Sequence, residues 1–120
     1  MSGIARLQLT AFDTPDPQAL ARFWSTVTGL PIGSTEDDWV ELDAGGGPTL
    51  AFQLSPQRRA PAWPQDGALQ AHLDLEVEDL DAGEAAVLEA GATKSVEQPG
   101  ETFRVFLDPD GNPFCLVRAT

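Results

Sequence analysis

The sequence predicts an α+β fold made of two similar halves. Residues 71–79 alternate apolar and polar side chains and end in Asp, as residues 7–13 do earlier in the chain. Each segment precedes a short helical pattern that stops at a glycine, Gly29 in the first half and Gly91 in the second. Strand-like runs follow each glycine, so each half has a strand, a helix and about three more strands. Neither half can bury both faces of its sheet alone, so we expect the two to pack together.

Length and composition restrict the function classes. The chain has 120 residues, enough for one domain with a core, and its hydrophobic content of 42% is ordinary. No apolar run approaches the roughly 18 residues that a membrane span needs, and no secretory signal begins the chain. The formal net charge of −12 argues against nucleic acid or an anionic membrane as partner. The single cysteine, Cys115, excludes an internal disulfide and favours a cytoplasmic location.

The first half begins with a predicted strand over residues 4–12, in which Leu7, Leu9 and Ala11 share one face. Asp16 suits the N-cap of the following helix, and Pro17 suits its first position. Gly29 is placed to end this helix. The apolar stripe of the helix consists of Leu20, Phe23, Trp24 and Val27.

Three further strands are predicted before the middle of the chain. A short edge strand covers residues 30–32, because its proline cannot donate to a central ladder. Residues 39–42 and 49–54 alternate like strands, with a glycine-rich turn at residues 45–48 between them. Residues 56–67 are expected to form a linker, in which Trp63 is an apolar anchor or part of a lid.

The second half repeats this order. A strand is predicted over residues 69–77, followed by a helix that Asp81 and Glu84 begin as a capping box. Ala85 and Leu88 supply the apolar stripe of this helix. Strands over residues 103–107 and 114–117 flank a turn at residues 108–112.

Several pieces, in this order, resemble the vicinal oxygen chelate superfamily of glyoxalases, bleomycin-resistance proteins and extradiol dioxygenases. The pieces are Asp16-Pro17 with residues 20–24 and Gly29-Leu30, residues 72–77 with 79–81, Gly91-Ala92, and residues 108–112 with Phe114. They span nearly the whole chain and look most like small bacterial glyoxalase-like proteins. The resemblance implies one domain, residues 1–120, with two βαβββ modules that form an open eight-stranded cup. Module one would cover residues 1–55 and module two residues 68–120.

The resemblance also implies where a metal would be bound. Metal enzymes of the superfamily place ligands at matched strand positions, which correspond here to Arg6, Gln53, His72 and Cys115. This set is poor, because arginine stays protonated and none of the four is a carboxylate. We therefore expect no metal cofactor, with His72 as a weak ligand candidate. A shifted site would need Glu41, Asp74 or Glu76.

Strand alternation predicts which side chains face the cup. The helices would cover Leu7, Leu9, Val40, Leu42, Leu50, Phe52, Leu54, Leu73, Leu75, Phe114 and Leu116. The cup would contain Arg6, Gln8, Thr10, Trp39, Glu41, Ala51, Gln53, His72, Asp74, Glu76, Cys115 and Val117. The predicted ligand-binding residues are Arg6, Gln8, Trp39, Glu41, Gln53, Trp63, His72, Asp74 and Cys115. A slip of one residue would exchange the two faces.

Three functions fit these residues. The first is metal-independent binding of a small organic molecule, as in the bleomycin-resistance branch, with a homodimer implied by that resemblance. The second is an enzyme: a lyase, isomerase or dioxygenase with a shifted metal, or an acid–base catalyst using Glu41 and His72. The third is a non-catalytic accessory module. A nucleophilic role for Cys115 would require a lowered pKa.

Overall fold

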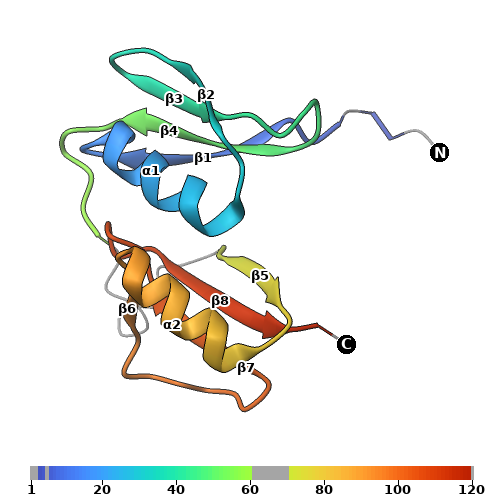
Figure 1. Cartoon of the computed structure of the whole chain (residues 1–120). Coiled ribbons are helices and arrows are strands. Elements are labelled where there is room, and N and C mark those ends of the chain that lie inside the picture. Colours follow the sequence, from blue (N-terminus) through green and yellow to red (C-terminus); the bar gives the residue numbers. More distant parts are fainter. Residues whose placement is uncertain (1–2, 5, 61–70, 120) are drawn as a thin grey trace. The chain divides into compact units, whose positions relative to one another are not determined.

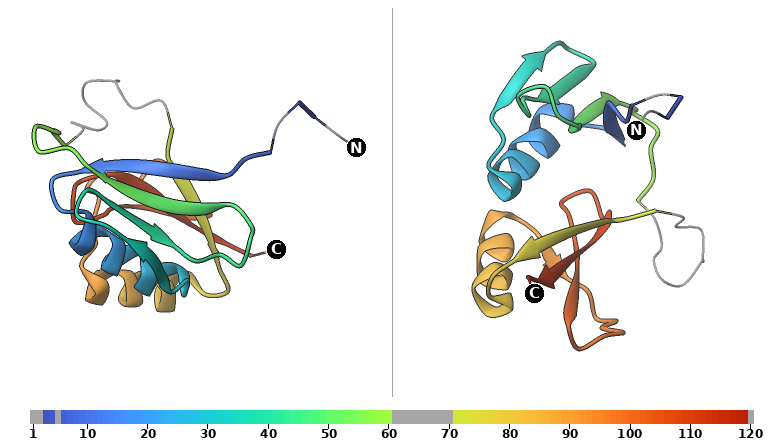
Figure 2. Two further views of the ribbon diagram at one scale, coloured as in Figure 1. Left: turned by 90° about the horizontal axis from the view of Figure 1, so that it is seen from above. Right: turned by 90° about the vertical axis from the view of Figure 1, so that its right-hand side faces the viewer.

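The computed structural model describes residues 3–4, 6–60 and 71–119. The chain divides into two compact units, Met1–Arg58 and Arg59–Thr120. Each unit contains one helix and one four-stranded sheet in the order strand, helix, three strands, which confirms the α+β class and the two βαβββ modules (Figure 1). In each unit the helix lies on one face of its own sheet (Figure 2). Among the described residues, no helix combines the length and apolar character needed to cross a membrane.

Module one follows the predicted helix and strands closely. Its elements are β1 (Leu9–Thr14), α1 (Pro17–Thr28), β2 (Ile32–Thr35), β3 (Trp39–Leu42) and β4 (Thr49–Leu54), with sheet order β1-β4-β3-β2. The Asp16 side chain caps α1 by accepting a hydrogen bond from the Ala19 N–H at 3.1 Å. Gly29 ends the helix with φ of 77°, a left-handed conformation that glycine adopts without strain. The edge strand β2 lies just after Pro31, slightly later than predicted.

The prediction for the first strand was wrong in both its start and its face. β1 begins at Leu9, because its partner β4 begins at Thr49 and offers no pairing before that residue. Leu7 lies outside the sheet and is 70% exposed. The Phe12 ring contacts the Trp24 ring of α1, with centroids 5.8 Å apart. Thr10 and Phe12 therefore face the helix, and Leu9 and Ala11 face the opposite side.

Module two consists of β5, α2, β6, β7 and β8. Their bounds are Leu73–Val77, Leu80–Ala90, Thr93–Lys94, Phe103–Leu107 and Pro113–Arg118, with sheet order β5-β8-β7-β6. β5 starts later than predicted, and residues 69 and 70 lie outside the described residues. β6 was not predicted as a strand, because two residues are too few to show alternation.

The predicted capping box of α2 is also wrong. The N-cap is Asp79, whose Oδ1 accepts hydrogen bonds from the N–H groups of Asp81 and Ala82. The buried residue of the helix is Val87, whereas Ala85 and Leu88 are exposed. The helix begins at Leu80, and its buried face contains Gly83 and Val87.

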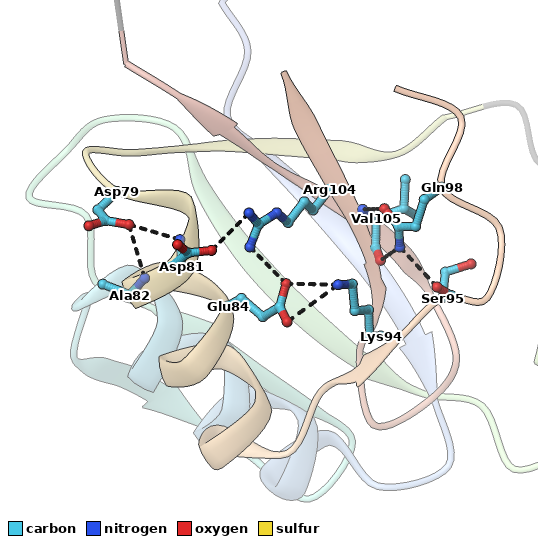
Figure 3. A network of polar contacts seen from close by, with 9 residues as sticks. All are labelled: Asp79, Asp81, Ala82, Glu84, Lys94, Ser95, Gln98, Arg104 and Val105. Carbon is cyan, nitrogen blue, oxygen red and sulfur yellow. Dashed lines mark hydrogen bonds and ion pairs between the residues drawn. The ribbon is translucent and has the colours of Figure 1, made fainter. Parts of the chain in front are cut away.

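Asp81 and Glu84 do not cap α2. Their carboxylates instead form ion pairs with basic residues of the sheet. Arg104 of β7 lies between them, with its guanidinium 2.9 Å from Asp81 and 3.0 Å from Glu84 (Figure 3). Lys94 of β6 approaches Glu84 at 3.1 Å. Burial alone would raise the pKa of Glu84, but the hydrogen bonds from Lys94 and Arg104 outweigh it and lower that pKa. This cluster occupies the helix side of the sheet.

Candidate functional site

A pocket of about 410 Å³ lies on the face of the module-two sheet opposite α2. Its lining residues are His72, Asp74, Pro99, Phe103, Val105, Pro113, Cys115 and Val117. All of these described residues belong to module two. Most are apolar, and the polar groups are few, which is typical of sites that bind small molecules.

Strand alternation explains why these side chains share one face. A Cβ placed on Gly83 of α2 would lie 3.1 Å from Val77 and 3.3 Å from Leu116, so these two residues point toward the helix. Their neighbours Cys115 and Val117 must then point away from it. The register pairs Cys115 with Asp74 on β5 and with Val105 on β7. The pairing therefore gathers residues from three strands into one pocket floor.

The polar end of the pocket consists of His72, Asp74 and Cys115. The Nε2 atom of His72 is 3.1 Å from Oδ1 of Asp74, and their side chains are 47% and 60% exposed. Cys115 is buried beside them. One ligand atom from each of the three residues lies within 4.8 Å of the others. The Asp74 carboxylate of this cluster can bind a positively charged group, and the Cys115 thiol can donate a hydrogen bond.

Cys115 is not poised to act as a nucleophile. Burial, together with the charge and hydrogen bond of Asp74, raises the pKa of its thiol to about 11. The lowered pKa that nucleophilic catalysis requires is therefore the opposite of what the site produces. At neutral pH the group is a neutral thiol on the pocket floor.

The loop after β6 forms one wall of the pocket and is held by Gln98. The Gln98 amide nitrogen donates to the carbonyl oxygens of Ser95 and Val105 at 2.9 and 2.8 Å, and its oxygen accepts from the Val105 N–H at 3.0 Å (Figure 3). The side chain thus satisfies backbone groups of β7 much as a neighbouring strand would. Pro99, the next residue, lines the pocket. A Cβ on Gly100 would overlap the Phe103 ring, so glycine leaves room for that ring.

The structure places three of the predicted site residues, His72, Asp74 and Cys115, in one pocket. Arg6 and Gln8 border a shallow depression of module one beside Gly46, Gly47 and Pro48. Trp39 donates a 3.4 Å hydrogen bond to Glu41, and Gln53 pairs with Trp39 in the sheet. Trp63 lies outside the described residues.

Of the apolar walls, the sequence analysis placed Val117 on the cup face but missed Pro99, Phe103, Val105 and Pro113. Phe103 and Val105 alternate with Arg104 along β7, so the same period of two would have identified them. Pro99 carried no signal, because it lies in a loop whose position depends on the Gln98 side chain.

Module one offers no metal ligand at the positions matched to His72 and Cys115. His72 lies as many residues before the helix cap Asp79 as Leu9 lies before the helix cap Asp16. The counterpart of His72 in module one is therefore Leu9 and not Arg6. Asp74 pairs with Cys115, and the equivalent residue Ala11 pairs with Ala51, which replaces Gln53 as the counterpart of Cys115. Aliphatic side chains donate no electron pair to a metal. Module one therefore contributes no ligand at the matched positions.

Comparisons with known proteins agree with this fold. Residues 10–117 match the family described as glyoxalase-like domain. A glyoxalase/bleomycin resistance protein/dioxygenase family enzyme from Burkholderia phytofirmans PsJN is structurally similar, with a TM-score of 0.76 at 20% identity over 97% of this chain and 100% of that one. A glyoxalase/bleomycin resistance protein from Albidiferax ferrireducens T118 has a TM-score of 0.66 at 20% identity, covering 95% and 98%.

A possible glyoxalase from Bacillus cereus has a TM-score of 0.70 at 13% identity, covering 96% of this chain and 99% of that one. The comparison with curated proteins gives no match. At these identities the solved structures establish the fold alone, whereas the family match covers most of the sequence. The chain therefore belongs to the glyoxalase-like domain family of the vicinal oxygen chelate superfamily.

Proposed function

We propose that this protein binds a small organic molecule in the pocket of module two, without a metal. The observation that carries the proposal is the pocket itself, in which apolar walls from β7 and β8 meet a polar end at His72, Asp74 and Cys115. Its volume of about 410 Å³ is within the range of sites that bind drug-sized ligands. Phe103 supplies an aromatic surface against which a ring can stack.

Metal independence is supported by the side chains at the matched strand positions. Module one carries Leu9 and Ala51 at the positions matched to His72 and Cys115, and neither side chain can ligate a metal. Binding then depends on shape, apolar contact and hydrogen bonds. Drug sequestration of the bleomycin-resistance type is the closest model, because the names of similar structures include that activity.

The test is a thermal-shift screen of aromatic metabolites and antibiotics, followed by calorimetry on any that stabilise the protein. A ligand that binds only the native state raises the melting temperature. Phe103→Ala should weaken binding of a hit about tenfold, because it removes an aromatic wall. Val96→Ala is a matched control, since Val96 lies in the same module and is 93% exposed. Equal affinities of the Phe103→Ala variant and the wild type would exclude this pocket, and no hit at all would favour an accessory module.

We also propose that the protein is a homodimer located in the cytoplasm. The dimer rests on the superfamily resemblance, and the location on the single cysteine. Light scattering coupled to gel filtration at several concentrations tests the dimer. A monomer mass at the highest concentration would contradict it.

A second candidate function is a lyase, isomerase or dioxygenase with a shifted metal site. The specific observation in its favour is that Asp74 joins His72 and Cys115 to make three ligand types found in zinc sites. Such an ion would supply Lewis-acid activation of a bound carbonyl or hydroxyl oxygen. Metal analysis of untagged protein tests it. Stoichiometric zinc, iron, manganese or nickel that is lost in both His72→Ala and Cys115→Ser would support the enzyme over the metal-free binder.

A further inference from the structure

We infer that the ligand of this pocket is an apolar molecule bearing a protonated amine, with the amine placed against Asp74. This inference rests on the proposed function and adds the charge and orientation of the ligand. Among the described residues that line the pocket, Asp74 is the only carboxylate, and none is lysine or arginine. A site with one carboxylate and no permanent cation favours a positive group on its ligand.

The nearest arginine along β7 does not compensate Asp74. Arg104 separates the pocket residues Phe103 and Val105, but its side chain points to the opposite face of the sheet. There it is engaged by Asp81 at 2.9 Å and Glu84 at 3.0 Å (Figure 3). Alternation thus places the positive charge on the helix side and the apolar residues on the pocket side.

His72 and Cys115 leave Asp74 available to a ligand. His72 meets Oδ1 of Asp74 at 3.1 Å, and the Asp74 side chain remains 60% exposed. The neutral thiol of Cys115 hydrogen-bonds to the same carboxylate without carrying a charge. An ammonium group has three donors and can satisfy a carboxylate that is already partly hydrogen-bonded. An anionic ligand would instead meet Asp74 as a like charge.

The apolar residues of the pocket determine the shape of the non-polar part of the ligand. Phe103, Val105, Val117, Pro99 and Pro113 provide apolar surface, with Val105 and Pro113 buried. A flat hydrocarbon body gains from displacing water along these walls. The chain's net charge of −12 also raises the local concentration of cations around the site.

The experiment compares two probes of the same shape, naphthylmethylamine and naphthylmethanol, by titration calorimetry. The wild type should bind the amine about tenfold more tightly than the alcohol, because only the amine forms a charged hydrogen bond. Asp74→Asn should reduce this ratio to about twofold or less. Glu76→Gln is the matched control: Glu76 shares the strand and face of Asp74 but does not line the pocket, so the ratio should stay near tenfold.

A second readout locates the probe. The chain contains one histidine, so its imidazole gives a single set of nitrogen and proton signals. The amine should shift the His72 signals of the wild type, and the circular dichroism of Asp74→Asn should match the wild type to show that it folds. Val96→Ala, at an exposed position of the same module, should retain the amine preference, and its loss there would show that the preference does not depend on the pocket.

The outcomes separate this inference from the proposed function. If both probes bind the wild type equally, the proposed ligand-binding pocket is retained and the preference for a cationic ligand is excluded. If Asp74→Asn keeps the full preference, the amine is recognised elsewhere and the inference fails. If neither probe binds nor shifts His72, the proposed pocket itself is wrong.

Discussion

Cys115 differs from a reactive cysteine because of what surrounds its sulfur. It is 7% exposed, and burial together with Asp74 raises its pKa to about 11. We predict that iodoacetamide alkylates folded protein at least about 100-fold more slowly than urea-unfolded protein near neutral pH, because the thiolate is the attacking species. Alkylation rates measured by mass spectrometry check this. Equal rates in the two states would show that the thiol is neither buried nor perturbed.

The same raised pKa predicts how stability depends on pH. The folded state favours the protonated thiol, so this contribution is complete below the ordinary pKa of 9.0 and is lost as the pH rises toward about 11. Its size is on the order of 2 kcal/mol. Urea unfolding should show the wild type losing more stability than Cys115→Ala across that window. Equal losses of stability in the wild type and in Cys115→Ala would contradict the raised pKa of Cys115.

Gly100 controls the shape of the pocket through Phe103. A Cβ at this position would overlap the Phe103 ring, which can move because it borders the pocket. We predict that Gly100→Ala weakens binding of the naphthyl probe about fivefold while costing roughly 1 kcal/mol of stability. Gly47→Ala is the control, since its nearest contact would be an ordinary 3.6 Å. Calorimetry and urea unfolding measure both effects, and unchanged affinity in Gly100→Ala would be the contrary result.

At the level of single residues, sequence reasoning found the polar end of the pocket and Val117, and missed the other apolar walls. Asp74 and Cys115 lie on β5 and β8, and His72 directly precedes β5, so the alternation of well-patterned strands predicted their face. Arg6 was misplaced because Asp13 was matched with Asp79, whereas Asp16 is the residue that caps α1 as Asp79 caps α2. Asp16 was predicted correctly as the cap of α1, but the cap of α2 was assigned to Asp81, so the equivalence of Asp16 and Asp79 was missed.

The N-terminus of α2 depends on Asp79. Its carboxylate accepts hydrogen bonds from the N–H groups of Asp81 at 2.8 Å and Ala82 at 3.2 Å. We predict that Asp79→Ala lowers the free energy of unfolding by about 1 kcal/mol, whereas Asp81→Ala costs about half of that or less. Asp81 contributes only an ion pair to Arg104, and its side chain is 88% exposed. Urea unfolding of both variants checks the order, and a larger loss in Asp81→Ala would restore the original capping box.

Most elements were predictable because their signals are local. α1 has a cap, a first-turn proline and a terminal glycine, and its bounds were predicted correctly. β3, β4 and β7 were also bounded correctly from their alternation. The ends of β1 and β5 were not, since a strand extends only as far as its partner offers pairing. The partner of each, β4 or β8, comes much later in the chain.

At the scale of the whole molecule, charge is unbalanced. The chain has 19 acidic and 7 basic residues, so like charges repel in the folded state. We predict that the melting temperature rises by a few degrees between about 20 and 200 mM NaCl, as salt screens this repulsion. The double variant Asp37→Asn/Asp38→Asn should show a smaller rise, because it removes two adjacent exposed charges. A melting temperature that falls with salt would mean that ion pairs such as those of Arg104 dominate instead.

The matched positions of the two modules differ, because module one carries Leu9 and Ala51 where module two carries His72 and Cys115. When a gene contains two copies of one unit, the first copy can accumulate substitutions on the sheet face opposite its helix while the second copy retains the binding residues. Selection on recognition would then act on one half of the chain, and selection on the other half would act on folding alone. Deep mutational scanning with selection for ligand binding should therefore find that most substitutions are tolerated at Leu9 and few at Asp74.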